Sequence, residues 1–98
     1  MIVVFTAEAE ADLERVGDFI ARDNPRRAVS FVTELVERCL QLADIPEGFP
    51  LVPRHASSGI RRRPHGSYLI FYRVDGGRIE ILHILSGVRD WESLLFPD

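Results

Sequence analysis

Apolar and polar positions occur in blocks along the chain, and each block has the period of one type of secondary structure. Residues 1–5 are apolar and rich in β-branched side chains, which predicts a short strand. Thr6 can cap a following helix, whose first turns hold acidic residues where the helix dipole favours them. We expect this helix to end near Asn24. Its predicted buried face, at helical spacing, consists of Leu13, Val16, Gly17 and Ile20.

A second helix should follow directly, because Asn24 is a good cap and Pro25 is tolerated at the first helical position. Its apolar positions cover more than one face and are Ala28, Val29, Phe31, Val32, Leu35, Val36, Cys39, Leu40 and Leu42. Packing against a single neighbour needs only one stripe, so we expect something else to cover the excess. Cys39 is the single cysteine and is expected to pack in the core.

The second half of the chain is rich in strand signals. Prolines and glycines predict an irregular connection over residues 45–58. Strands are predicted at 59–63, 67–74 and 78–85, the last two joined by a turn at Asp75-Gly76-Gly77. A short apolar helix or tail should close the chain beyond Trp91.

This order of elements predicts an α+β fold. We expect a βααβββ(α) two-layer sandwich, in which a helical hairpin packs on a small, mostly antiparallel sheet. Residues 1–98 should form a single domain, since a chain of this length buries one core. No apolar run is long enough to span a bilayer and the start lacks the features of a signal peptide, so we expect a cytoplasmic protein.

Charge and possible chemistry narrow the function only slightly. The net charge of −3 combines an acidic first half with a basic second half, in which every basic side chain is arginine. No phosphate-binding loop, redox motif or metal motif is present, so we predict no catalytic residue, cofactor or metal. His55, His65 and His83 are far apart in sequence and are expected to have structural roles, as are Tyr68 and Tyr72.

The densest basic cluster is Arg61-Arg62-Arg63. It could bind phosphate or an acidic protein surface, although a solvated strand edge carries charge as well. Alternation on a strand would place Arg61 and Arg63 on one side and Arg62 on the other. Trp91 could anchor a partner or pack back onto the sheet.

Taken together, the sequence resembles the ParE branch of the RelE/ParE toxin superfamily. The matching segments are Ala11-Asp12-Leu13 with Ile20, Asn24-Pro25, Gly59-Ile60-Arg61, Tyr68-Leu69-Ile70-Phe71-Tyr72-Arg73-Val74, Ile81-Leu82-His83-Ile84-Leu85 and Arg89-Asp90-Trp91. The resemblance implies a toxin that forms a hetero-oligomer with a ParD-like antitoxin, through which alone the complex would contact DNA. It also implies inhibition of DNA gyrase by protein binding, without catalysis.

Two sets of residues are predicted to carry these interactions. Arg61, Arg63, Arg89 and Trp91 are expected to form or border the surface that binds the target. Phe31, Leu35 and Leu42 are expected to line a groove for an amphipathic helix of the antitoxin.

Two alternatives stay open at this stage. A RelE-like toxin is a ribosome-dependent mRNA endonuclease with the same fold, an Arg on the third strand and a Tyr in the C-terminal segment. By alignment of the Tyr68 strand and the Gly87-x-Arg89 segment, this chain has Leu69 and Leu95 at those positions. That difference argues against RNA cleavage. The other alternative is a non-toxic structural partner in an antitoxin complex.

Overall fold

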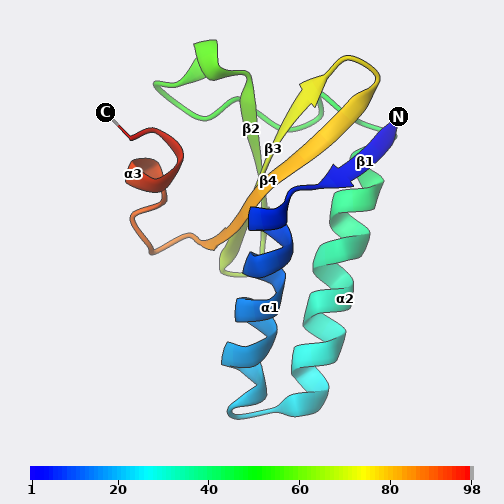
Figure 1. Cartoon of the computed structure of the whole chain (residues 1–98), viewed down its shortest axis with the longest axis vertical. Helices are drawn as coiled ribbons and strands as arrows, with labels where there is room; N and C mark the ends of the chain where they lie inside the picture. Colours follow the sequence, from blue (N-terminus) through cyan, green and yellow to red (C-terminus); the bar gives the residue numbers. More distant parts are fainter. Residues whose placement is uncertain (98) are drawn as a thin grey trace.

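A four-stranded sheet with a helical hairpin on one face forms the fold of the computed structural model, which describes residues 1–97 (Figure 1). The strands are β1 (Ile2–Phe5), β2 (Ile60–His65), β3 (Tyr68–Asp75) and β4 (Arg78–Ser86). The helices are α1 (Ala7–Ala21), α2 (Pro25–Gln41) and the short α3 (Trp91–Leu95), with a 3-10 turn at Ala56–Ser58. Within residues 1–97, no helix is long and apolar enough to cross a bilayer.

The sheet has the order β1-β4-β3-β2, with β1 parallel to β4 and the other neighbours antiparallel. Strands β3 and β4 are therefore central and are joined by a turn in which Gly76 has a φ of 63°, a conformation that glycine adopts without strain. The predicted βααβββ(α) sandwich is confirmed.

Two predicted boundaries were wrong, each for a local reason. Helix α1 ends at Ala21, because Asn24 is extended (φ −152°, ψ 90°) and its side chain accepts a hydrogen bond from the Arg27 N–H as the cap of α2. Strand β2 continues through Pro64 to His65. Proline is compatible with this position because β2 lies at the sheet edge, where a missing N–H is tolerated.

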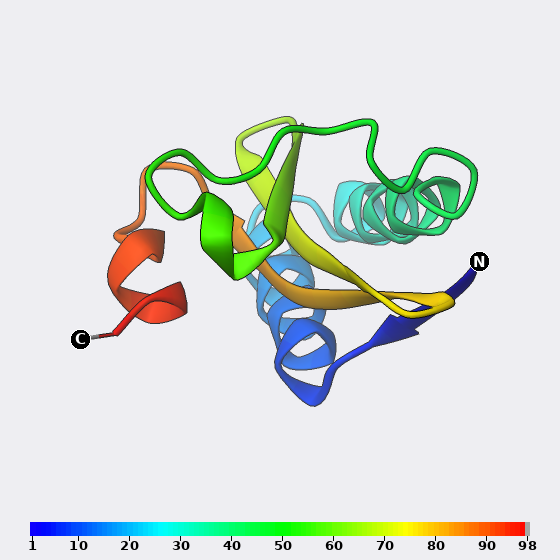
Figure 2. The ribbon, with the colours of Figure 1, turned by 90° about the horizontal axis from the view of Figure 1, so that it is seen from above.

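Apolar side chains gather on both faces of the sheet. The larger cluster joins the sheet to α1 and α2, and the smaller one lies on the opposite face under α3. Figure 2 shows α2 and α3 on opposite sides of the twisted strands. The most buried residues of α1 are Ala9, Asp12 and Val16. The predicted face of α1 is therefore rotated, since Leu13, Gly17 and Ile20 are only half-buried.

The wide apolar surface of α2 is explained by two neighbours. Ala28, Phe31, Leu35 and Cys39 are its buried residues, and the last three belong to the cluster that packs on the sheet. A second stripe meets α1, where Gly17 lies so close to Val32 that an added Cβ would be 3.3 Å from a Val32 methyl carbon. Val29 remains 70% exposed, so part of the predicted excess is uncovered in the isolated chain.

A buried carboxylate fastens α1 to the central strand. Because β1 ends at Phe5, the edge of β4 beyond Ile81 has no strand partner. Thr6 bonds there through its hydroxyl, which donates to the Ile81 carbonyl oxygen at 2.8 Å. Asp12 Oδ2 then accepts from the Ile84 N–H at 2.9 Å and contacts His83 Nδ1 at 2.8 Å, while Arg15 pairs with Oδ1. Side chains of α1 thus replace the missing strand.

Replacing Asp12 with alanine should lower the free energy of unfolding by about 3 kcal/mol, because it leaves the Ile84 N–H and His83 without their acceptor. Urea denaturation of the purified chain measures this loss. Glu14→Ala, at an exposed position of the same helix, should change stability by less than about 0.5 kcal/mol. Equal effects of the two substitutions would contradict the role given to Asp12.

The thiol of Cys39 should be unreactive in the folded chain. Its side chain is fully buried, and burial raises its pKa to about 12, so the nucleophilic thiolate is not formed near neutral pH. Labelling with a thiol reagent at pH 8 should therefore follow the unfolding transition across a urea series. Rapid labelling in native buffer would show that α2 opens independently of the rest of the fold.

Candidate partner-binding surfaces

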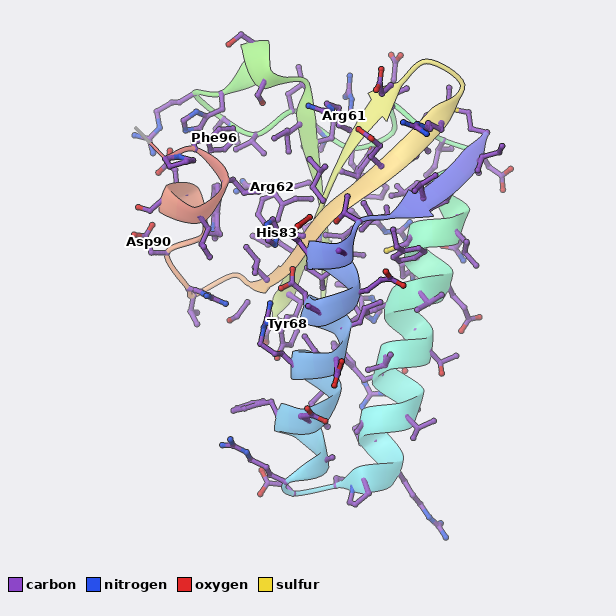
Figure 3. The ribbon with its side chains drawn as sticks, viewed as in Figure 1. Arg61, Arg62, Tyr68, His83, Asp90 and Phe96 are labelled. Carbon is purple, nitrogen blue, oxygen red and sulfur yellow. The ribbon has the colours of Figure 1, made fainter. Side chains whose placement is uncertain are left out.

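The outer face of the sheet is covered by α3. Trp91 packs against Phe71 of β3, with ring centroids 5.2 Å apart, and the guanidinium carbon of Arg62 lies 5.4 Å from the Trp91 ring centroid. Figure 3 shows Arg62 between the strands and α3. Trp91 therefore packs back onto the sheet, which was one of the two possibilities that the sequence left open. The residue stays partly exposed beside Arg62.

The C-terminal segment is held from its other side by the loop before β2. The His55 ring stacks on Phe96 with centroids 3.7 Å apart, and His55 Nε2 lies 2.6 Å from Glu92 Oε2. Asp90 caps the start of α3 by accepting from the Ser93 N–H at 3.3 Å. Figure 3 places Asp90 and Phe96 at the two ends of α3. These contacts fix the position of Trp91 on the sheet.

Arg61 and Arg63 lie on the other side of β2, where they brace the fold. Arg61 Nη1 donates to the Phe49 carbonyl oxygen at 2.7 Å, and Arg63 Nη1 donates to the Arg38 carbonyl oxygen at 3.2 Å. Partial burial lowers the pKa of the Arg63 guanidinium. Strand alternation therefore turns Arg61 and Arg63 away from Trp91 and leaves Arg62 beside it. That Arg61 and Arg63 form or border a target-binding surface stays a prediction.

The residues predicted to line the antitoxin groove were placed wrongly. Leu35 and Leu42 are fully buried and Phe31 is nearly so, because they form the stripe of α2 that packs on the sheet. An open groove of about 490 Å³ lies instead between α1 and α2 on the outside of the hairpin. It is lined by Leu13, Glu14, Gly17, Asp18, Ala21, Pro25, Ala28, Val29, Val32 and Thr33.

Each of the three histidines contacts a different carboxylate. His65 Nε2 lies 3.0 Å from Glu34 Oε1, and the pKa of Glu34 is lowered by its hydrogen bonds with Arg27 and His65. His83 pairs with Asp12 and His55 with Glu92. Within residues 1–97, no three His, Cys, Asp or Glu side chains gather closely enough to hold a metal ion.

Tyr72 is likewise a packing residue. Its hydroxyl donates to the Pro46 carbonyl oxygen at 3.0 Å, and burial raises its pKa. This contact ties the loop after α2 to the centre of the sheet.

Sequence reasoning missed Arg62 and Val29. Arg62 shares its side of β2 with Ile60, whose apolar side chain belongs to the cluster under α3, so alternation could have assigned it to the face that Trp91 covers. Val29 stands within the broad apolar stripe of α2, and only the orientation of α1 shows that it stays exposed.

Comparisons with known proteins agree on one group. The family model for the ParE toxin of the type II toxin–antitoxin system parDE matches residues 3–91. A solved structure of the chromosomal ParDE system from P. aeruginosa is similar at 26% identity, covering 88% of this chain and 95% of that chain with a TM-score of 0.75. No curated protein matches the sequence significantly.

A second structure shares the fold. It comes from the toxin–antitoxin complex RelBE2 of Mycobacterium tuberculosis, with 24% identity, coverage of 87% of this chain and 95% of that chain, and a TM-score of 0.65.

Arg61→Ala should destabilise the chain by about 1–2 kcal/mol, because it removes a charged hydrogen bond that holds the loop around Phe49. Arg89→Ala is the matched control, since within residues 1–97 the Arg89 side chain has no hydrogen-bond or ion-pair partner. Thermal denaturation of both variants measures the difference. Equal stability of the two would mean that Arg61 does not brace the loop.

Proposed function

Because the chain belongs to the ParE toxin family of type II toxin–antitoxin systems, we propose that it inhibits DNA gyrase by binding it, without catalysis of its own. A ParD-like antitoxin neutralises it by covering the helical hairpin. Both encounters take place in the cytoplasm. Binding as the mode of action is supported above all by the chemistry of the outer face of the sheet.

That face is apolar where a RelE-like nuclease carries its polar groups. Leu69 and Leu95 stand at the positions aligned with the Arg and the Tyr of that branch, and both pack against the cluster under α3. In-line attack by a ribose hydroxyl needs a proton acceptor and positive charge on the phosphate. Two leucines supply neither.

The target surface that we propose is the exposed rim around α3. Trp91 with Arg62 stacked on its ring forms the kind of aromatic and arginine pair that dominates protein interfaces. Arg89 precedes α3 and adds a guanidinium that has no ion-pair partner among residues 1–97. Arg61 and Arg63 project from the other side of β2, where they bond to the Phe49 and Arg38 carbonyl oxygens, so they border this rim only through the strand itself.

The antitoxin site that we propose is the groove between α1 and α2. Its lining consists mainly of small and branched apolar residues, on which the apolar side of an amphipathic helix can pack. Val29 is 70% exposed at its rim, although burial would be favourable. Glu14 and Asp18 border the same groove, so an amphipathic helix with basic residues on one flank fits it best.

Purified gyrase should lose supercoiling activity as this protein is added, and the ParD-like antitoxin should restore it. A ribosome-programmed mRNA cleavage assay run alongside should show intact message. A variant with Arg62, Arg89 and Trp91 all replaced by alanine should inhibit at least ten-fold less. Cut mRNA with normal supercoiling would instead establish the nuclease alternative.

Val29→Asp should weaken binding of the ParD-like antitoxin at least ten-fold, because it places an unpaired charge in the apolar groove. The substitution should leave the fold intact, since Val29 is exposed. Ile2→Asp is the matched control, because Ile2 is also 70% exposed and lies outside the groove. Titration calorimetry gives both affinities, and equal affinities would exclude the hairpin groove as the antitoxin site.

A further inference from the structure

A second depression lies on the opposite flank of α1 from the hairpin groove. This cleft, which we call the α1–β4 cleft, has a volume of about 250 Å³ and is bounded by α1, the start of β3 and the end of β4. Its lining consists of Asp12, Arg15, Val16, Phe19, Tyr68, Ile84, Leu85, Ser86 and Arg89. Figure 3 shows Tyr68 beside α1 at this end of the sheet.

The polar groups of the cleft are mainly donors. Arg89 has no ion-pair partner among residues 1–97, and the Tyr68 hydroxyl has no hydrogen-bond partner there. The Ser86 oxygen accepts a long hydrogen bond from the Val88 N–H at 3.4 Å, which leaves its own hydrogen free. Arg15 uses one nitrogen on Asp12 and is otherwise exposed. These donors point to an acceptor-only ligand group.

The one acid in the cleft does not cancel this character. Asp12 is 2% exposed, and its two oxygens are already occupied by Arg15, His83 and the Ile84 N–H. The unbalanced charge is therefore that of Arg89. One carboxylate on a ligand would balance the positive charge of Arg89. An arginine can hold a carboxylate through two parallel hydrogen bonds.

The remaining lining is apolar. It is formed by Val16, Ile84, Leu85 and Phe19. The Phe19 side chain is 62% exposed to solvent. An exposed phenylalanine next to donors that have no partner among residues 1–97 favours a ligand that joins an apolar group to its anionic end.

We propose that the α1–β4 cleft binds an aspartate or glutamate side chain, next to an aromatic or aliphatic residue, of the antitoxin polypeptide. The proposal rests on the proposed function in one respect, namely that an antitoxin is the partner. Since Arg89 also belongs to the proposed target surface, occupation of the cleft removes a group that the target needs. Antitoxin and target then compete for Arg89.

The charges around the cleft favour a polypeptide over a nucleic acid. Glu8, Glu10 and Glu14 are exposed along α1, and the whole chain has a net charge of −3. A phosphate backbone crossing α1 would be repelled by these side chains, whereas an isolated carboxylate meets only the arginines. A peptide segment leaving the hairpin groove needs only to pass over α1 to reach the cleft.

The cleft can be tested on the chain alone with 3-phenylpropionate, which carries a carboxylate and an aryl group, followed by NMR. Shifts should appear at the side-chain N–H signals of Arg15 and Arg89 and at the Ser86 amide, with a Kd on the order of 1–10 mM. Arg89→Gln should weaken binding at least five-fold and Tyr68→Phe two- to five-fold. Arg26→Gln, at an exposed position of α2, is the matched control and should have no effect.

Two further ligands separate the alternatives. The neutral 3-phenylpropionamide should bind at least ten-fold more weakly, and inorganic phosphate should not displace the carboxylate at equal concentration. The site would be overturned if the amide bound as tightly as 3-phenylpropionate, or if Arg89→Gln bound 3-phenylpropionate as tightly as the unchanged chain. It would also be overturned if phosphate bound more tightly than the carboxylate.

The partner is tested separately by antitoxin affinity. Arg89→Gln should weaken antitoxin binding at least five-fold. Unchanged antitoxin affinity, with 3-phenylpropionate still bound in the cleft, would overturn the assignment of the occupant. Neither measurement uses gyrase, so failure of the cleft and failure of gyrase inhibition can be told apart.

Discussion

The position of α1, and with it the shape of both depressions beside it, depends on one buried carboxylate. Strand β1 is too short to pair with the full length of β4, and an unpaired central strand would leave buried backbone groups unsatisfied. Asp12 supplies the missing acceptor for the Ile84 N–H, and its remaining capacity is filled by His83 and Arg15. A buried charge is tolerable only with such complete pairing. These bonds, together with the packing of Ala9 and Val16 in the core, orient the helix on the sheet.

That orientation decides what remains available to a partner. With Asp12 and Val16 facing the sheet, one flank of α1 meets α2 across Gly17 and forms the hairpin groove, while the other flank borders the α1–β4 cleft. The groove is apolar with an acidic border, and the cleft is rich in donors, among them Arg89, which has no ion-pair partner within the described part of the chain. The two depressions differ in chemistry and lie on the two flanks of α1, so a polypeptide segment that wraps around α1 could occupy both. We expect an antitoxin segment that folds on binding to wrap in this way.

The opposite face of the sheet has a different use. There α3 seals a small apolar cluster, and the contacts of His55 with Phe96 and Glu92 hold it in place. Leucines occupy the positions at which the nuclease branch has polar groups, and this is the observation from which we propose binding as the mode of action. Its rim, with Arg62 over Trp91, offers groups of the kind that make strong interfaces.

The sequence by itself determined the order of elements, the hairpin turn at Asp75-Gly76-Gly77, the cap at Asn24 and the family, because these depend on local conformational preferences and on the spacing of short motifs. It also placed Cys39 in the core. It could not determine which of two apolar stripes on α2 faces the sheet, so Phe31, Leu35 and Leu42 were taken for surface although they are core. Nor could it show that Arg61 and Arg63 bond to carbonyls distant in the chain, or that Asp12 is buried. Those outcomes depend on how α1, β1 and β4 meet, and contacts between residues some seventy positions apart are decided only by the tertiary structure.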